Sequence, residues 1–133
     1  MSHFGRGRVL RAEIDSPTYD ANYFDPRGTQ DLWFPVTAPY LKLAAVEDQS
    51  GGITLFALNR HLTEPMPLTV AMTGFLGKAI KAARTLHHAD LNATNTRDAP
   101  DTVRPAPLAS VSIAGDTMRA TLPPASWNVI RLG

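Results

Sequence analysis

The sequence contains no cysteine and no long apolar run, and each absence excludes a class of protein. Without cysteine there is no disulfide framework and no thiolate metal site, and nothing argues for an oxidising compartment. The opening residues MSHFGRGRVLR are positively charged, but the polar stretch AEIDSPTYD follows where a signal peptide or a membrane span would be apolar. We therefore expect a soluble, cytoplasmic protein that contacts no membrane.

The charges show no excess of one sign. Thirteen lysines and arginines stand against 12 aspartates and glutamates, which gives a net charge of +1. This balance excludes the strongly basic surface that is typical of nucleic-acid-binding proteins. Arg6, Arg8 and Arg11 form the only local excess, and we expect them to lie at a solvated edge or to pair with neighbouring carboxylates.

Long helices are not expected, because 11 prolines and nine glycines interrupt the 133 residues. Short strands fit better. Residues 40–47 (YLKLAAVE) and 53–59 (ITLFALN) are apolar runs of strand length, separated by DQSGG. Gly51 and Gly52 can supply the positive φ angles of a hairpin connection, so the two runs predict a β-hairpin.

Further strands are predicted along the rest of the chain. Residues 67–72 (PLTVAM) alternate between apolar and polar side chains with the period of two expected of a half-buried strand. Residues 111–113 and 118–122 predict a second hairpin across the Gly115-Asp116 turn. Residues 126–132 (SWNVIRL) form a terminal strand. Residues 78–88 (KAIKAARTLHH) suit a helix by composition and a strand by alternation, and we favour the strand.

Several short strands with turn signals between them, and no alternation of strands with helices, indicate an all-β antiparallel β-sandwich. We expect a single domain, because one hydrophobic core typically organises roughly 100 to 150 residues. Residues 40–133 would form the sandwich core, and residues 1–39 an irregular lead-in with a candidate strand at VLRAEI. Residues 15–39 are expected to cross the surface as an extended segment, pinned by Trp33 and Phe34.

No catalytic, cofactor-binding or metal-binding residue is predicted. The only glutamates are Glu13, Glu47 and Glu64, and most aspartates stand beside turn-forming residues, where they cap and turn the backbone. His87 and His88 would point to opposite faces of a strand and could not share one metal ion. There is no cysteine and no G-x-S-x-G motif to supply a nucleophile.

Aromatic side chains are the remaining route to a binding site, because sugar rings stack on Trp and Tyr faces. Trp33, Tyr40 and Trp127 are the candidates for sugar contact, although burial in the core is the more common role of such residues. The loop DLNATNTRDAPDTVRP (residues 90–105) is interpreted as structural. Its Asn and Asp side chains can bond their own backbone, and two prolines stiffen a long crossover between strands.

Three stretches together resemble one family. They are LFALNRHLTEPMPLTV (residues 55–70), HHADLNATNTRDAPDTVRP (87–105) and LPPASWNVIRL (122–132). In order and spacing they are similar to the C-terminal domain of α-L-arabinofuranosidases of glycoside hydrolase family 51. GRGRVL and DSPTYD also resemble the segment by which such enzymes leave their catalytic barrel. The resemblance covers almost the whole chain.

The resemblance implies a jelly-roll-like β-sandwich attached to a (β/α)₈ barrel. That barrel removes arabinofuranosyl groups from arabinan and arabinoxylan with retention of configuration. The family's acid/base and nucleophile glutamates lie on the barrel, so neither role can be carried over to Glu13, Glu47 or Glu64. The resemblance implies no cofactor, and this chain alone is expected to be inactive.

Three functions remain open. The first is a non-catalytic accessory domain that packs against the barrel and helps to assemble oligomers; such a domain by itself would expose an apolar patch and an unpaired strand edge. The second is a stand-alone carbohydrate-binding module for an arabinose-containing glycan, which requires Trp33 or Trp127 to be exposed. The third is an independent enzyme, which requires a carboxylate pair that the sequence does not indicate.

Overall fold

The computed structural model describes residues 2–24 and 33–133, where nearly all regular structure is β-strand. The only helical segment of these residues is a short 3-10 turn, η1 (Ser2–Gly5). No helix in this part of the chain has the length and hydropathy needed to cross a membrane. The strands are β1 (Arg8–Leu10), β2 (Thr18–Phe24), β3 (Trp33–Pro39), β4 (Leu41–Glu47), β5 (Ile53–Asn59), β6 (Met66–Ala71), β7 (Ile80–Leu86), β8 (Ala106–Pro107), β9 (Val111–Ala114), β10 (Thr117–Leu122) and β11 (Ser126–Leu132).

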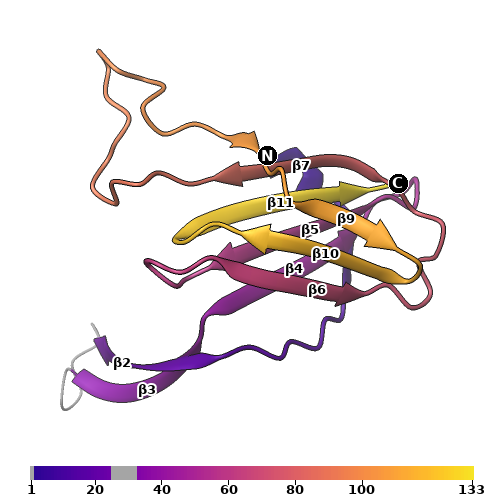
Figure 1. Cartoon of the computed structure of the whole chain (residues 1–133), viewed down its shortest axis with the longest axis horizontal. Helices are drawn as coiled ribbons and strands as arrows, with labels where there is room; N and C mark the ends of the chain where they lie inside the picture. Colours follow the sequence, from indigo (N-terminus) through magenta and orange to yellow (C-terminus); the bar gives the residue numbers. More distant parts are fainter. Residues whose placement is uncertain (1, 25–32) are drawn as a thin grey trace.

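Two sheets face each other as the layers of a sandwich (Figure 1). The larger has six strands in the order β1-β4-β5-β11-β7-β8, and the smaller has three in the order β6-β10-β9. All strand pairings within and between these elements are antiparallel. The prediction of an all-β antiparallel sandwich is confirmed.

Both predicted hairpins are present, as β4–β5 and β9–β10. In the first turn Gly51 has a φ of 78°, as the sequence predicts. Gly52 has a different role, because a Cβ atom there would lie 2.7 Å from the carboxylate of Asp48. The turn therefore requires Gly52 for its small size and Gly51 for its backbone conformation.

The ambiguous segment 78–88 contains the strand β7, as favoured from its alternation. β7 pairs with β11 on one side and with β8 on the other. Its backbone groups complete the ladder of the large sheet, which a helix at this position could not do. Tertiary pairing thus outweighs the helix propensity of its alanines and lysines.

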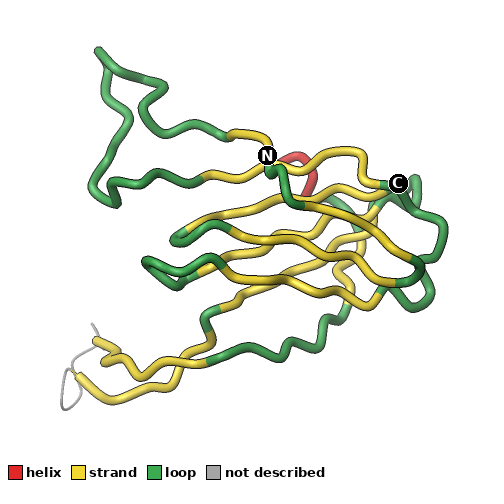
Figure 2. The backbone as a smooth tube through the Cα atoms, in the orientation of Figure 1, coloured by secondary structure: helices red, strands yellow, loops and turns green. Residues whose placement is uncertain are grey.

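The lead-in segment is more regular than predicted. Residues 18–24 and 33–39 pair as the antiparallel hairpin strands β2 and β3, which extend away from the sandwich instead of crossing its surface (Figures 1 and 2). A cross-strand hydrogen bond from Thr37 Oγ1 to Asp20 Oδ1 (3.0 Å) supports the pairing. Pro35 and Pro39 argue against a strand in the sequence, but both strands of a two-stranded sheet are edges, where proline is tolerated.

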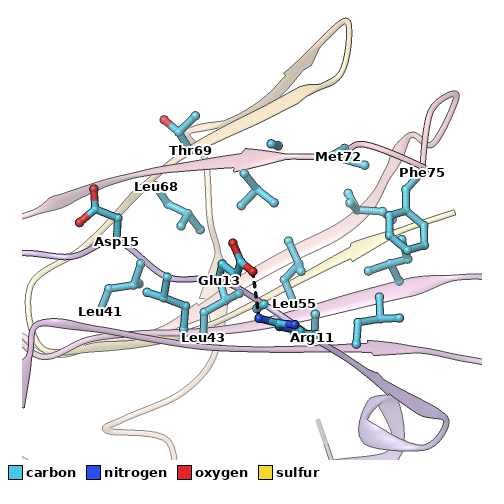
Figure 3. A pocket seen from close by; sticks show the side chains of 18 residues that line it. Arg11, Glu13, Asp15, Leu41, Leu43, Leu55, Leu68, Thr69, Met72 and Phe75 are labelled. Carbon is cyan, nitrogen blue, oxygen red and sulfur yellow. Dashed lines mark ion pairs between the residues drawn. The ribbon is translucent and has the colours of Figure 1, made fainter.

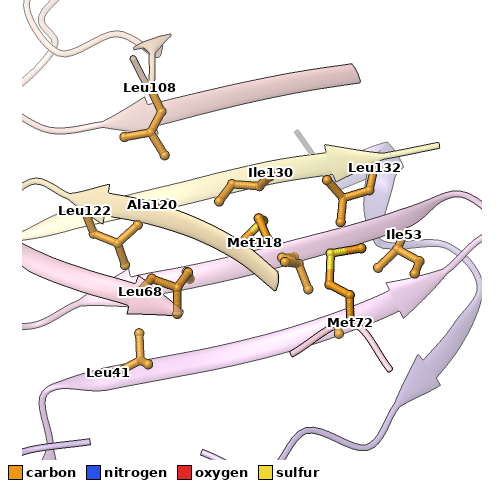
Figure 4. Packing of buried hydrophobic residues seen from close by; sticks show 13 residues of the cluster. Leu41, Ile53, Leu68, Met72, Leu108, Met118, Ala120, Leu122, Ile130 and Leu132 are labelled. Atoms are coloured by element: carbon orange, nitrogen blue, oxygen red, sulfur yellow. The ribbon is translucent and has the colours of Figure 1, made fainter. Parts of the chain in front are cut away.

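The hydrophobic core lies between the two sheets (Figure 4). Alternate residues of each strand point inward, so β10 contributes Met118, Ala120 and Leu122, and β11 contributes Ile130 and Leu132. Among these, Met118, Leu122 and Ile130 have no exposed surface. Residues of this kind each contribute roughly 1.5–3 kcal/mol by leaving water, so this interface between the sheets is the main source of stability.

Candidate functional site

Of the three aromatic candidates for sugar contact, Trp127 is exposed and Tyr40 is half-buried. The side chain of Trp127, on β11, is 44% exposed. The ring centroid of Tyr40 lies 4.7 Å from that of Tyr19 and 4.6 Å from that of His61. The backbone of Trp33 belongs to β3, but its side chain lies outside the described residues. Trp127 therefore fits the aromatic-contact hypothesis better than Tyr40.

Tyr40 connects the β2–β3 hairpin to the sandwich. Its backbone N–H donates to the carbonyl of Pro17, and Arg60 donates to the carbonyl of Pro39 over 3.3 Å. The guanidinium of Arg60 also lies 5.2 Å from the ring centroid of Tyr19 in a cation–π arrangement. The contacts of Tyr40 are with its own chain, and they favour a structural role.

Two of the three glutamates are paired with arginines. Arg8 and Glu47 form an ion pair of 2.6 Å between β1 and β4, and Arg11 and Glu13 form one of 3.1 Å. The expectation that the N-terminal arginines pair with carboxylates is confirmed for Arg8 and Arg11. Glu64 contributes its backbone carbonyl as an acceptor for Asn59. None of these contacts holds two carboxylates together as a glycosidase requires.

The histidines His61, His87 and His88 differ in their hydrogen bonds. His61 Nδ1 accepts a hydrogen bond from the backbone N–H of Glu64 (2.9 Å), and His88 Nδ1 contacts the backbone of Asp90. The Nδ1 atom of His87 is buried without a hydrogen-bond partner. In the described part of the chain no group of three or more His, Cys, Asp or Glu residues is placed to hold a metal ion.

A buried amide, that of Asn59, holds one end of the sandwich together. Its Nδ2 group donates to the carbonyls of Glu64 (3.0 Å) and Pro123 (2.8 Å), and its Oδ1 accepts from the N–H of His61 (2.9 Å). These partners belong to the β5–β6 connection and to the β10–β11 turn. Asn59 has no exposed surface, so water cannot replace these bonds.

A second buried amide, Asn128, continues this polar layer. Its Nδ2 group donates to Ser126 Oγ (2.8 Å) and to the carbonyl of Ala57 (3.1 Å). Ser126 Oγ in turn donates to the carbonyl of Pro123, which also accepts from Asn59. Both asparagines lie in stretches that carry the family resemblance, and sequence reasoning missed their role. The available signal was a polar residue at an inward position of an apolar strand.

Asp48 organises the turn at the other end of β4 and β5. Its Oδ1 atom accepts from Ser50 N–H, Ser50 Oγ and Gly52 N–H, and its Oδ2 atom accepts from Arg131 over 3.0 Å. The hydrogen bond from the Ser50 hydroxyl, followed by that from the Gly52 N–H, lowers the pKa of the Asp48 carboxyl below its ordinary value. The interpretation of this aspartate as a turn-forming residue is confirmed.

The loop of residues 90–105 is held by its own side chains. Asn95 Nδ2 donates to the carbonyl of Val103 (2.9 Å), and Asn95 Oδ1 accepts from the N–H of the same residue (2.6 Å). The Asp90 carboxylate accepts from the N–H of Asn92. The loop does not cross over, because it returns to β8, which pairs with β7. It extends from the same end of the molecule as the β2–β3 hairpin (Figure 2).

A cavity of about 410 Å³ opens between β4 and β5 of the large sheet and β6 of the small sheet (Figure 3). Leu43, Leu55 and Leu68 contribute to its largely apolar wall, and the ion-paired Arg11 and Glu13 lie on one side. β6 is a terminal strand of its sheet.

The matching family model and the curated relatives identify the same family. Residues 1–126 match a family model described as the alpha-L-arabinofuranosidase C-terminal domain. An intracellular exo-alpha-(1->5)-L-arabinofuranosidase of Streptomyces lividans is 37% identical over 130 residues, which are 98% of this chain and 18% of that protein. A relative of the same name from Halalkalibacterium halodurans is 35% identical over 133 residues, 99% of this chain and 24% of that protein. The chain thus spans less than a quarter of these relatives.

Solved structures give the same result for the fold. The chain superposes on a family 51 alpha-L-arabinofuranosidase from Bifidobacterium longum with a TM-score of 0.76 and 30% identity, over 97% of this chain and 23% of the other. The GH51 enzyme of Thermotoga petrophila also gives a TM-score of 0.76, at 22% identity and over 97% of this chain and 26% of the other. The second likeness concerns the fold alone.

Replacing Asn59 with Ala should destabilise the protein by about 3 kcal/mol, because buried backbone groups in two connections lose their partners. Denaturant unfolding followed by circular dichroism measures the change. Asn22→Ala, at an exposed position of β2, is the matched control and should change stability by less than about 0.5 kcal/mol. Equal effects of the two substitutions would contradict the role of the buried amide.

The lowered pKa of Asp48 makes stability depend on pH in a defined direction. Since the folded-state pKa lies below the unfolded-state value, the contribution of Asp48 is complete above about pH 4 and is lost as the pH falls through the folded-state pKa. Ser50→Ala should raise the pKa of Asp48 towards its ordinary value. An NMR titration of the carboxyl carbon checks this, and identical titration curves in both proteins would refute the assigned cause.

Asn95→Ala should lower the melting temperature, with a loss of about 1 kcal/mol, because the side chain closes the loop through two hydrogen bonds to Val103. Asn92→Ala is the control in the same loop, since Asn92 is bonded there through its backbone N–H. Calorimetric melting of both variants gives the comparison. An unchanged melting temperature for Asn95→Ala would argue against a structural loop.

Proposed function

Because this chain belongs to the α-L-arabinofuranosidase C-terminal domain family of glycoside hydrolase family 51, we propose that it serves as a non-catalytic accessory domain of an α-L-arabinofuranosidase. The parent enzyme would remove terminal non-reducing arabinofuranosyl groups from arabinan or arabinoxylan in arabinan degradation and L-arabinose metabolism. The chemistry would belong to a (β/α)₈ barrel, and residues 1–133 would form one sandwich domain that packs against it.

The observation that carries this proposal is that the chain matches only a small part of a much longer enzyme of the family. The chain aligns over 98% of its own length with an arabinofuranosidase of which it represents 18%. In the described residues the ion pairs of Glu13 and Glu47 are with Arg11 and Arg8, and neither ion pair is the pair of carboxylates that glycoside hydrolysis uses. The residues that perform the reaction are accordingly expected in the part of the parent enzyme that this chain does not match.

The same comparison supports a location and a further partner. The relatives from Streptomyces lividans and Halalkalibacterium halodurans are named intracellular enzymes, which supports a cytoplasmic location.

We propose oligomer assembly as a second role. Its support is that β6 and β9 are terminal strands of the small sheet and offer edges for pairing. Sedimentation across a concentration series tests it, and a monomer throughout would argue against edge pairing.

A hybrid enzyme tests the accessory role. In the Streptomyces lividans enzyme, the segment that aligns with this chain is replaced by residues 1–133. We expect the hybrid to hydrolyse p-nitrophenyl α-L-arabinofuranoside, the truncated enzyme without this segment to be at least about tenfold less active after mild heating, and the isolated chain to be inactive. A folded isolated chain with arabinofuranosidase activity of its own would contradict the proposal.

The second candidate function is carbohydrate binding, and the exposure of Trp127 is the observation that favours it. A stand-alone module would bind arabino-oligosaccharides by stacking a sugar ring on this side chain. Isothermal titration calorimetry of the isolated chain at millimolar ligand, with Trp127→Ala as control, distinguishes the two functions. Saturable heat that disappears in the variant would establish sugar recognition, and no heat in the wild-type chain would exclude it at this concentration.

A further inference from the structure

The outer faces of the two sheets differ in chemistry. On the small sheet, the outward residues are mostly polar and exposed, and they include Thr69 on β6, Ser112 on β9, and Arg119 and Thr121 on β10. The register pairs Arg119 with Thr69 on one side and with Ser112 on the other, and it pairs Thr121 with Pro67. This is the composition expected of a sheet face that stays in water.

On the large sheet the outward residues are mostly apolar. β4 presents Ala44, β5 presents Phe56 and Leu58, and β11 presents Trp127 and Val129, of which Val129 is already buried within this chain. The register places Leu58 beside Trp127 and Phe56 beside Val129, so the residues form continuous rows. A sandwich that stands alone has no physical reason to carry such rows on an outer face, because they cost solubility without adding to the core.

The N-terminal turn η1 already covers one part of this face. The ring of Phe4 lies 4.9 Å from the guanidinium carbon of Arg131, and a Cβ atom on Gly5 would lie 3.8 Å from the ring of Phe56. Arg131 is held in turn by Asp48. Apolar residues outside this contact remain accessible, with Trp127 at 44% and Val9, beside β4, at 75% exposure.

The position of η1 indicates which part of the parent enzyme covers the remaining outer face of the large sheet. The family model describes a C-terminal domain, so in the relatives most of the unmatched chain precedes the matched segment. That chain would arrive at η1 and therefore at the outer face of the large sheet. We propose that this face, centred on Trp127 and Leu58, is the surface that docks the catalytic domain of the parent enzyme. The inference rests on the proposed accessory function and specifies its interface.

The charged residues on the outer face of the large sheet indicate which charges the docking surface of the catalytic domain should carry. Among the outward positions of β4, β5, β7 and β11, the charged residues are Lys42, Arg84 and Arg131, and none is acidic. Arg131 is paired with Asp48, whereas Lys42 and Arg84 are exposed beside the apolar rows. The matching surface of the catalytic domain is therefore apolar with carboxylates at its rim.

The test uses the hybrid enzyme with a lysine placed on either outer face. Trp127→Lys changes the proposed docking face on β11, and Thr121→Lys is the control on β10 of the other sheet. We expect Trp127→Lys to shorten the half-life of hybrid activity at elevated temperature about tenfold or more, because it removes a central aromatic anchor and buries a charge. Thr121→Lys should change the half-life by less than about twofold.

Measurements on the isolated chain complete the test. Because Trp127 is already exposed there, Trp127→Lys should leave its melting temperature nearly unchanged; a large fall would show that Trp127 supports the sandwich itself and would overturn the docking face. A wild-type chain that dimerises through Trp127, and loses the dimer in the variant, would assign the face to a second copy and would also overturn the proposed docking of the catalytic domain.

Equal half-lives for the two hybrid variants would refute the proposed docking face while the accessory function stands. An inactive unmodified hybrid would overturn the accessory function and, with it, this inference.

Discussion

The side-chain amide of Asn59 is the interaction on which the arrangement of the sandwich most depends. Asn59 ends β5, a central strand of the large sheet, and its bonds reach the connection to β6 and the turn between β10 and β11. Both β6 and β10 belong to the small sheet. Hydrophobic burial brings the sheets together without specifying direction, whereas a buried amide must find particular partners. The amide therefore fixes how the connections between the layers fold.

Asn128 extends this constraint into β11, and the shared acceptor is the carbonyl of Pro123. The stretches LFALNRHLTEPMPLTV and LPPASWNVIRL, which lie far apart in the sequence, thus meet in one polar layer. Both stretches also carry the family resemblance. They supply the amides and the turn that join the two sheets.

The remaining features concern the outer surfaces of the sandwich and the segments that extend from it. One sheet has a polar outer face and the other an apolar one, the N-terminal turn lies on the apolar face, and a hairpin and a loop extend from one end (Figure 2). An apolar cavity lies beside β6, and β6 is a terminal strand of its sheet among the described residues. Under the proposed accessory function, such surfaces would serve contacts with another domain.

The sequence by itself determined the all-β class, the β4–β5 and β9–β10 hairpins and the structural character of Asp48, because period-two alternation and turn residues are local signals. It also indicated the family, through motifs that are read along the chain. Only the tertiary structure decided that residues 18–24 pair with residues 33–39, since prolines are acceptable there only if both strands are edges. It likewise decided that Asn59 and Asn128 are buried together and that Trp127 lies on an exposed apolar face. Burial and partnership are set by which strands become neighbours, and strand order depends on contacts between residues far apart in the sequence.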